Sequence, residues 1–428
     1  MSSYRFVHAA DLHLDSPFHG LFADAPEQAE TLRRATFDVY ERVVDLCIEE
    51  QVDALLVAGD VFDSADNSLA AQLKFRDGLV RLAEHGIRSF VCHGNHDPLD
   101  GWRAELQWPA EAHRFGPEPE AVPLNPDDPA SPIVYGISYP TREVRVNLVP
   151  RFPARETGRP AIGLIHANVG SNTGHENYAP CTVDDLVHTG YDYWALGHVH
   201  TRAALRAPDQ GAPVVVYPGN TQGRHANEPG ARGVYLVEMD ERGAVTKLQF
   251  KPLDVVRWET LLVAIDGLED EQGLIDALES VVRTAVDAAD NRDMVYRARL
   301  SGRGLIHMSI ARRGFLADLQ ARLNGQFAVQ RPFALCERII DATAVPFDRD
   351  ELSRGGDFVA DLLSLIDEVR ADPPELARLA EEAKLADLYE HSRARRYLAD
   401  AYPDESALAA LVDGAEQLLL SGLVEEAG

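Results

Sequence analysis

The sequence has no apolar run that approaches the ~20 residues needed to span a lipid bilayer. Residues 1–5 lead directly into a strand-like run and not into the apolar core of a cleavable signal. We therefore expect a cytoplasmic protein that has no membrane segment.

Cysteines are few and scattered, and none belongs to a CxxC pair. A disulfide framework needs a denser set of cysteines in a smaller, secreted chain. We therefore expect reduced structural thiols with no role in metal binding at Cys47, Cys92, Cys181 and Cys336.

Positive charge is also scarce, because 41 Lys and Arg stand against 69 Asp and Glu, for a net charge of −28. Contacts to nucleic-acid phosphates need clustered Lys and Arg, so this balance excludes a protein whose whole surface binds nucleic acid. It leaves room for a local basic groove. Carboxylates can also hold divalent cations, although a solvated acidic surface is the simpler interpretation of most of them.

The 428 residues are enough for two or three domains. Over residues 1–252, short apolar runs alternate with segments that have apolar residues at helical spacing, such as 36–50 and 68–84. This pattern predicts a layered α/β domain, with a Pro-rich irregular loop over 116–132. The strand-like runs are residues 6–10, 54–58, 90–92, 162–165, 193–196 and 214–217.

Residues 253–345 have a different pattern, which predicts a small α+β domain. Strands are expected over 261–265, 294–300 and 327–340, and helices over 269–289 and 305–323. Between residues 291 and 340, nine arginines stand against three acidic residues. This is the one clearly basic region of the sequence, and it includes Arg312 and Arg313.

Residues 346–428 are acidic and predict helices with apolar stripes, for example along 358–369 and 408–419. The simpler interpretation is that these stripes pack within their own domain. Short helices with apolar faces also form docking surfaces, so a partner-binding region is the alternative.

Metal-binding side chains end most of the apolar runs in the first 200 residues. In α/β folds, ligand sites lie at the carboxyl ends of strands, so these side chains are expected to meet. Within each Asp-x-His or His-x-His pair, the two side chains would point to the same side of an extended strand. The motifs are Asp11-Leu12-His13, Gly59-Asp60, Gly94-Asn95-His96-Asp97, His166 and Gly197-His198-Val199-His200.

Phosphoester cleavage needs a nucleophile at neutral pH and compensation for the charge of the phosphate, and two cations ~3.5–4 Å apart provide both. Asp60 is the candidate bridge between the cations. We assign Asp11, His13 and His200 to one metal, and Asn95, His166 and His198 to the other. Such mixed ligands favour Mn²⁺, Fe²⁺ or Zn²⁺ over Ca²⁺.

His96 follows the Asn95 ligand, so it is expected to face the substrate, where it could protonate the leaving oxygen or stabilise the transition state. Asp97 is expected to bind its imidazole and fix the tautomer. Each motif alone has a structural interpretation, since Gly-Asp dipeptides mark turns and a single buried histidine is more often structural. Four motifs in fixed order, each after a strand-like run, favour the metal site.

These motifs, together with Gly59-Asp60-x-x-Asp63, resemble the signature of the calcineurin-like metallophosphoesterases. The segments 6–18 and 217–225 are similar to those of bacterial DNA repair exonucleases of the YhaO type, relatives of SbcD. The resemblance covers residues 1–250. It implies a four-layer α/β sandwich with two Mn²⁺ ions, DNA cleavage, a capping domain that touches DNA, and a C-terminal region that docks an ABC-type or coiled-coil ATPase. Such relatives are often dimers.

One position departs from the resemblance, because some relatives have a histidine where this chain has Asp63. A second catalytic imidazole is therefore not expected, and Asp63 could bind a ligand histidine or cap a helix. Arg224 and His225 could contact a phosphate, or could form a structural turn with Glu228.

Three functions follow from the sequence. The first is a metal-dependent DNA exonuclease that works in DNA repair with an ATPase partner. The second is a phosphodiesterase or phosphatase that acts on nucleotides or phosphoproteins, since the same metal site serves both. The third is a non-catalytic subunit of an ATPase complex. The arginine-rich region favours the first.

Overall fold

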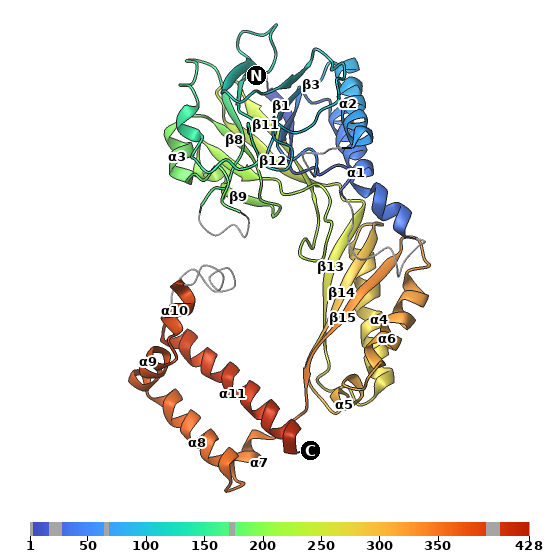
Figure 1. Cartoon of the computed structure of the whole chain (residues 1–428), viewed down its shortest axis with the longest axis vertical. Coiled ribbons are helices and arrows are strands. Elements are labelled where there is room, and N and C mark those ends of the chain that lie inside the picture. The colour runs from blue at the N-terminus through green and yellow to red at the C-terminus, as the bar shows by residue number, and fades with distance from the viewer. Residues whose placement is uncertain (1–2, 17–27, 64–67, 171–175, 391–402, 428) are drawn as a thin grey trace. The chain divides into compact units, whose positions relative to one another are not determined.

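The computed structural model describes residues 3–16, 28–63, 68–170, 176–390 and 403–427 (Figure 1). The chain forms two compact units, and each combines several segments of the sequence. The first unit comprises Met1–Thr260, Thr284–Arg297 and Asn324–Glu337, and the second comprises Leu261–Arg283, Ala298–Leu323 and Arg338–Gly428. The three domain ranges expected from the sequence stay a prediction.

Six strands form the first sheet of unit 1. Strands β1 to β4 are parallel, and β11 pairs antiparallel with both β1 and β12. Their order is β12 (Val245–Pro252), β11 (Gly233–Asp240), β1 (Ser3–Ala9), β2 (Ala54–Ala58), β3 (Arg88–Cys92) and β4 (Ala112–Arg114).

Six strands also form the second sheet. Its central strands are parallel, and its outer strands β5 and β9 are antiparallel to their neighbours. The order is β5 (Glu120–Pro123), β6 (Ile133–Gly136), β7 (Ala161–His166), β8 (Tyr193–Gly197), β10 (Val214–Tyr217) and β9 (Ala203–Arg206). The edge strand β5 runs through the region expected to be irregular, and its Pro123 is compatible with a sheet edge.

Alternation of apolar side chains along the strands produces four layers. In β2, Leu55 and Val57 pack with helices α1 (Ala29–Glu49) and α2 (Leu69–Glu84), whereas Leu56 and Ala58 pack against the second sheet. The outer face of the second sheet is covered by α3 (Val183–His188), the 3-10 turn η1 (Val149–Arg151) and loops. A second 3-10 turn, η2 (Pro208–Gln210), follows β9. The expected four-layer α/β sandwich is confirmed.

A third sheet has the order β13 (Val256–Ala264), β14 (Asp293–Arg303) and β15 (Ala334–Ala344). Its helices are α4 (Glu271–Ala288), α5 (His307–Ile310) and α6 (Phe315–Phe327). The single helix expected over 305–323 is two helices, because Gly314 has a φ of +90°, which an α-helix cannot accommodate. The last strand begins at Ala334 and not at Phe327, because Phe327 completes α6.

The remaining helices belong to unit 2. They are α7 (Arg349–Ser353), α8 (Phe358–Ala371), α9 (Pro373–Glu382), α10 (Leu385–Glu390) and α11 (Glu405–Ala427). Glu416 of α11 accepts hydrogen bonds from Arg349 and Arg370, so these charges join three of the helices. Among the described residues, no helix is both long enough and apolar enough to cross a membrane.

Candidate metal centre

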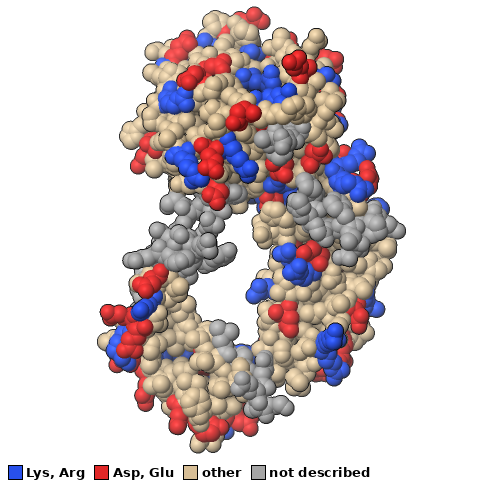
Figure 2. Space-filling model, in the orientation of Figure 1, with Lys and Arg blue, Asp and Glu red and all other residues tan. Residues whose placement is uncertain are grey.

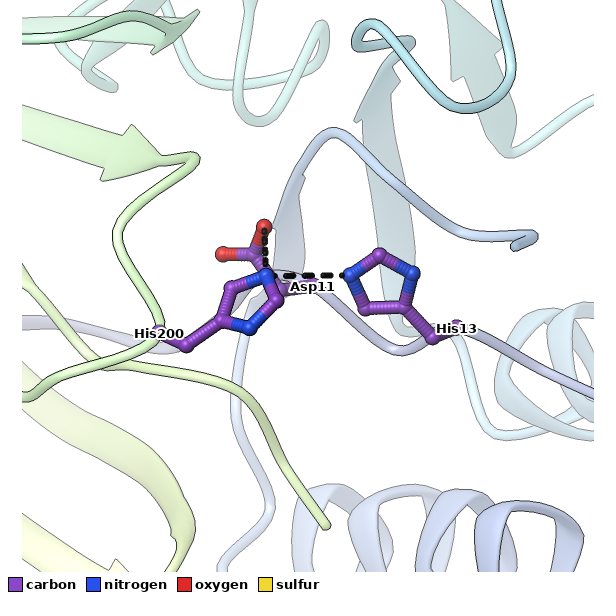
Figure 3. A group of neighbouring side chains, drawn as sticks. All are labelled: Asp11, His13 and His200. Carbon is purple, nitrogen blue, oxygen red and sulfur yellow. Dashed lines mark hydrogen bonds and ion pairs between the residues drawn. The ribbon is translucent and has the colours of Figure 1, made fainter. Parts of the chain in front are cut away.

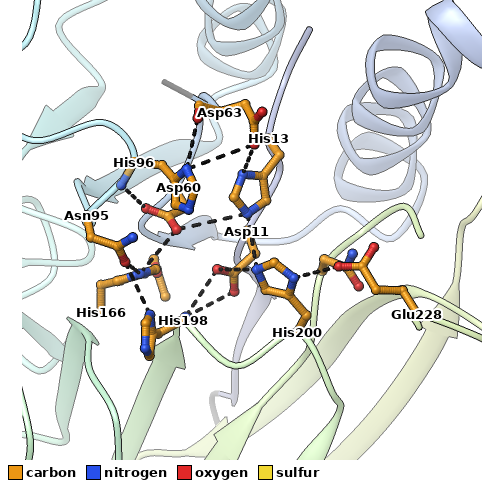
Figure 4. A network of polar contacts seen from close by, with 12 residues as sticks. Asp11, His13, Asp60, Asp63, Asn95, His96, His166, His198, His200 and Glu228 are labelled. Carbon is orange, nitrogen blue, oxygen red and sulfur yellow. Dashed lines mark hydrogen bonds and ion pairs between the residues drawn. The ribbon is translucent and has the colours of Figure 1, made fainter. Parts of the chain in front are cut away.

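The predicted ligands meet at the carboxyl ends of parallel strands from both sheets of unit 1, as expected for an α/β fold. Asp11 and His13 follow β1, Asp60 follows β2, Asn95 follows β3, His166 ends β7, and His198 and His200 follow β8. The seven residues are linked by a network of close polar contacts (Figure 4).

Left-handed backbone conformations bring the paired ligands together. The φ angles of Asp11, His13, Asp60 and His198 are 51°, 43°, 50° and 103°. Such values are uncommon for residues other than glycine and cluster at functional sites. The strand alternation expected to align Asp11 with His13 is therefore not the cause of their convergence, because β1 ends at Ala9 and both residues lie in the loop beyond it.

Glycines allow the loops to pack closely around the ligands. A Cβ atom at Gly94 would collide with the Asp60 carboxylate and the His166 ring. A Cβ atom at Gly59 would also collide with His166, and this glycine has a φ of +86°. The close approach of these side chains therefore explains why glycine occupies both positions.

The first group of ligands, which we call subsite A, consists of Asp11, His13 and His200 (Figure 3). The Nε2 atoms of His13 and His200 are 3.2 Å apart, and His200 Nε2 lies 3.8 Å from Asp11 Oδ1. Burial, followed by the positive charge of Arg224, lowers the pKa of His13 to about 3. Its imidazole is therefore neutral at physiological pH, as a metal ligand must be.

The second group, subsite B, consists of Asn95, His166 and His198. Asn95 Oδ1 lies 3.0 Å from His166 Nε2 and 3.2 Å from His198 Nδ1. Asp60 lies between the two subsites, because its Oδ2 is 3.3 Å from His166 Nε2 and 3.9 Å from His13 Nε2. This position is the one expected of a bridging carboxylate.

The electrostatics of the site favour bound cations. Burial raises the pKa of Asp11, so its charged form needs nearby positive charge. Burial also disfavours the Asp60 carboxylate, but the charge of His166 more than offsets this and holds the pKa of Asp60 well below its usual range. Burial lowers the pKa of His166, but Asp60 raises it more, to about 9, so this ring carries a proton that a bound cation has to displace. The carboxylates, imidazoles and amide present in the site fit two divalent transition-metal ions.

His96 and Asp97 have different surroundings from those expected. The Nδ1 atom of His96 lies 2.8 Å from the backbone oxygen of Asp63, and its ring is one-third exposed. Asp97 is buried, and its oxygens contact His93 Nδ1 and accept hydrogen bonds from the backbone N–H groups of Gly94 and Val61. The expected Asp97–His96 contact is therefore wrong, because the loop turns the carboxylate back onto its own backbone.

Arg224 lies beside the site, but it already donates hydrogen bonds to other groups of the protein. Its guanidinium, 11% exposed as a side chain, donates to Asp63 Oδ1 at 2.7 Å and to Ser16 Oγ at 3.0 Å. Its backbone N–H donates to Glu228 at 2.8 Å. These contacts favour the structural alternative for Arg224, whereas His225 is about half exposed.

Glu228 has a role that the sequence did not reveal. Its Oε1 lies 2.6 Å from His200 Nδ1, in addition to the turn contacts expected with Arg224 and His225 (Figure 4). Burial disfavours its charged form, but His200 and Arg224 hold the pKa of Glu228 well below its usual range. No local spacing indicated this contact, because 28 residues separate the two partners.

The arginine-rich region does not form one free basic surface. Arg297 is paired with Glu337, Arg322 with Glu279, and Arg292 with Asp254. By contrast, Arg312 and Arg313 are exposed at the turn between α5 and α6. On the face shown in Figure 2, basic and acidic side chains are interspersed.

Comparison with known proteins agrees with this geometry. Residues 4–202 match the calcineurin-like phosphoesterase family, and residues 258–344 match the middle domain of metallophosphoesterase YhaO. The chain is 35% identical over 346 residues to the uncharacterized metallophosphoesterase YhaO of Bacillus subtilis, an alignment that covers 80% of this chain and 83% of that protein.

More distant relatives are also similar. The DNA double-strand break repair protein Mre11 of Sulfurisphaera tokodaii is 25% identical, with 63% of this chain and 68% of that protein covered. One subunit of the nuclease SbcCD of Bacillus subtilis is 23% identical, with 71% and 85% covered. With its four-layer fold and its clustered ligands, the chain belongs to the calcineurin-like metallophosphoesterase family.

Proposed function

We propose that the protein is a metal-dependent DNA exonuclease that hydrolyses phosphodiester bonds with two divalent ions, most simply Mn²⁺, in DNA repair. The observation that carries this proposal is the convergence of two ligand subsites on Asp60, whose Oδ2 lies 3.3 Å from His166 Nε2 and 3.9 Å from His13 Nε2. Two ions in such a site compensate phosphate charge and lower the pKa of a water molecule.

His96 is the residue that we assign to the leaving group. A backbone oxygen only accepts hydrogen bonds, so the contact with Asp63 O places a proton on Nδ1 of His96. Its Nε2 is then the atom that gains and releases a proton. The partly exposed ring lies beside subsite A, with its centroid 5.0 Å from that of His13. This position suits a general acid that protonates the departing oxygen.

Two features support DNA as the substrate. Several similar proteins are DNA repair proteins or nucleases by name, among them Mre11 and the SbcCD protein. Arg312 and Arg313 are exposed neighbours that could contact successive phosphates, and His225 is a further candidate contact. Because the whole chain is acidic, such local groups have to supply the attraction to DNA.

We also propose that residues 346–428 dock an ABC-type or coiled-coil ATPase. The similar SbcCD protein is by name one part of a larger nuclease. In this chain, helices α9 and α11 line an apolar pocket of about 220 Å³ with Leu376, Leu379 and Leu411 among its walls. Such a pocket could receive an apolar side chain of a partner. A homodimer is also compatible with this arrangement.

A competition assay tests the substrate class. The purified protein with Mn²⁺ is given labelled linear DNA with blunt, 5′-recessed or 3′-recessed ends, with and without an excess of a small nucleotide phosphodiester. We expect DNA to be degraded and the small phosphodiester to compete poorly. Hydrolysis of the small compound with intact DNA would instead establish a nucleotide phosphodiesterase.

A further inference from the structure

We propose that the two metal subsites are inequivalent, and that subsite A retains its ion more tightly because Asp63, Arg224 and Glu228 form a support behind its histidines. The proposal rests on the two-metal site of the proposed function and assigns positioning roles to three residues outside the predicted set of ligands. We call the carboxylates of Asp63 and Glu228 the carboxylate support, and Arg224 contacts both of them.

Both histidines of subsite A turn one ring nitrogen toward a carboxylate and the other toward the site. His200 Nδ1 lies 2.6 Å from Glu228 Oε1, within a short hydrogen bond. His13 Nδ1 lies 3.0 Å from Asp63 Oδ1, although the angle of this contact is not that of a hydrogen bond. The two Nε2 atoms face each other at 3.2 Å. The hydrogen bond to Glu228 places a proton on Nδ1 of His200, and the nearby Asp63 carboxylate favours the same tautomer of His13. In that state both Nε2 lone pairs are available to one cation.

The histidines of subsite B have neutral supports instead. His166 Nδ1 lies 2.9 Å from the backbone oxygen of Ala58, and His198 Nε2 lies 2.7 Å from that of Glu176. Their other nitrogens, Nε2 of His166 and Nδ1 of His198, face Asn95 Oδ1. The two subsites thus use the same type of ligand with supports of different charge.

This difference affects metal affinity. A carboxylate that accepts the N–H of a ligand histidine makes the other ring nitrogen a better donor than a neutral carbonyl does, and it fixes the orientation of the ring. Loss of such a partner typically reduces metal affinity by about 10–100-fold. The carboxylate support also adds negative charge behind subsite A. We therefore expect the tighter ion there.

Arg224 keeps the two carboxylates in place. Its side chain contacts Asp63 at 2.7 Å and lies 3.6 Å from Glu228, while its backbone N–H donates to Glu228 at 2.8 Å. Both carboxylates contact the same guanidinium, whose positive charge offsets the cost of burying theirs. Arg224 is therefore a positioning residue that acts through Asp63 and Glu228 on the ligands His13 and His200.

The test is a titration of the full-length, metal-free protein with Mn²⁺, followed by calorimetry and by electron paramagnetic resonance, without DNA. For the unmodified chain we expect two binding steps of different affinity, with the magnetically coupled pair formed only in the second step. Glu228→Gln should weaken the tighter step by about 10–100-fold and leave the other unchanged. Asn95→Ala removes a predicted ligand of subsite B, and it should weaken only the looser step.

Two milder variants provide the same test if replacement of the buried Glu228 prevents the protein from folding. Asp63→Asn, at a partly exposed position, should weaken the tighter step less than Glu228→Gln, because its contact with His13 is not a well-aligned hydrogen bond. Arg224→Lys keeps the charge but loses the forked geometry, and it should also weaken that step.

Equal affinities in the unmodified chain, or a Glu228→Gln change confined to the looser step, would overturn the proposal. Two unequal steps in a protein that leaves DNA intact would refute the nuclease function and keep this inference.

Discussion

The Nε2 atoms of His13 and His200 lie 3.2 Å apart, although 187 positions separate the two residues in the sequence. Each ring also has its Nδ1 atom beside a carboxylate, so neither ring can readily donate a proton to the other. Two lone pairs that face each other at this distance would repel, so the contact needs a proton or a metal ion between the two nitrogens. This pair is therefore the most direct structural sign of a metal site in the chain.

Replacement of His96 separates catalysis from metal binding. His96→Ala should reduce DNA cleavage by about 10²–10⁴-fold, the usual contribution of a general acid or base. Metal content, measured by elemental analysis after gel filtration, should stay the same. Nδ1 of His96 contacts the backbone oxygen of Asp63, and the contact with Asp60 comes from the backbone N–H, which Ala retains. A loss of bound metal in this variant would show that His96 is a ligand.

Replacement of the exposed arginines at the turn between α5 and α6 tests the proposed DNA contact. Replacement of both Arg312 and Arg313 by Ala should weaken DNA binding and lower the slope of log K against log salt by about 2, since each phosphate contact contributes about 0.9. Fluorescence anisotropy at several salt concentrations measures both quantities. The matched control replaces Arg33 and Arg34 on α1 by Ala. An equal effect of the two double variants would contradict the assignment of Arg312 and Arg313 as DNA contacts.

Removal of the C-terminal helices tests whether this region docks an ATPase partner. A chain that ends at residue 345 should keep its metal ions, because all the ligands precede that position. It should lose an ATPase that co-purifies with the full chain, as identified by mass spectrometry of both complexes. Retention of the ATPase by the shortened chain would place docking elsewhere.

A buried histidine between the two sheets predicts how stability depends on pH. Burial lowers the pKa of His8 to about 3, while its ring nitrogens contact Tyr193 Oη and the backbone oxygen of Leu196. Between about pH 6.5 and pH 3, the unfolded chain binds a proton at His8 that the folded chain does not. This residue should therefore lower the free energy of unfolding by about 2 kcal/mol between pH 7 and pH 5.

The measurement is chemical denaturation at several pH values, and His8→Gln should reduce the slope over this range. His85→Gln is the control, because His85 is exposed at the end of α2. An unchanged slope in the His8 variant would mean that another group dominates the acid sensitivity.

The sequence was sufficient to predict that the candidate ligand side chains meet, and it was insufficient to predict the contacts behind them. Asp60 and His166 could be predicted because each occurs where an apolar run ends, and parallel strands bring such ends together. The contacts of Asp97 and Glu228 could not, because they depend on loop paths and on left-handed residues such as His198. Strands β11 and β12, which extend the first sheet, were not among the predicted strands. The two form a local hairpin, and only the pairing of β11 with β1 is long-range.

Digestion of linear duplex DNA by the metal-free protein, with Mn²⁺ added back and bound metal measured on the same sample, tests the central claim most directly. The account predicts cleavage that begins only with added metal and reaches its maximum at two ions per chain. Asp60→Asn should lose both cleavage and one or both ions, whereas the exposed control Asp100→Asn should behave like the unmodified protein. Intact DNA in a sample that holds two Mn²⁺ ions per chain would contradict the account.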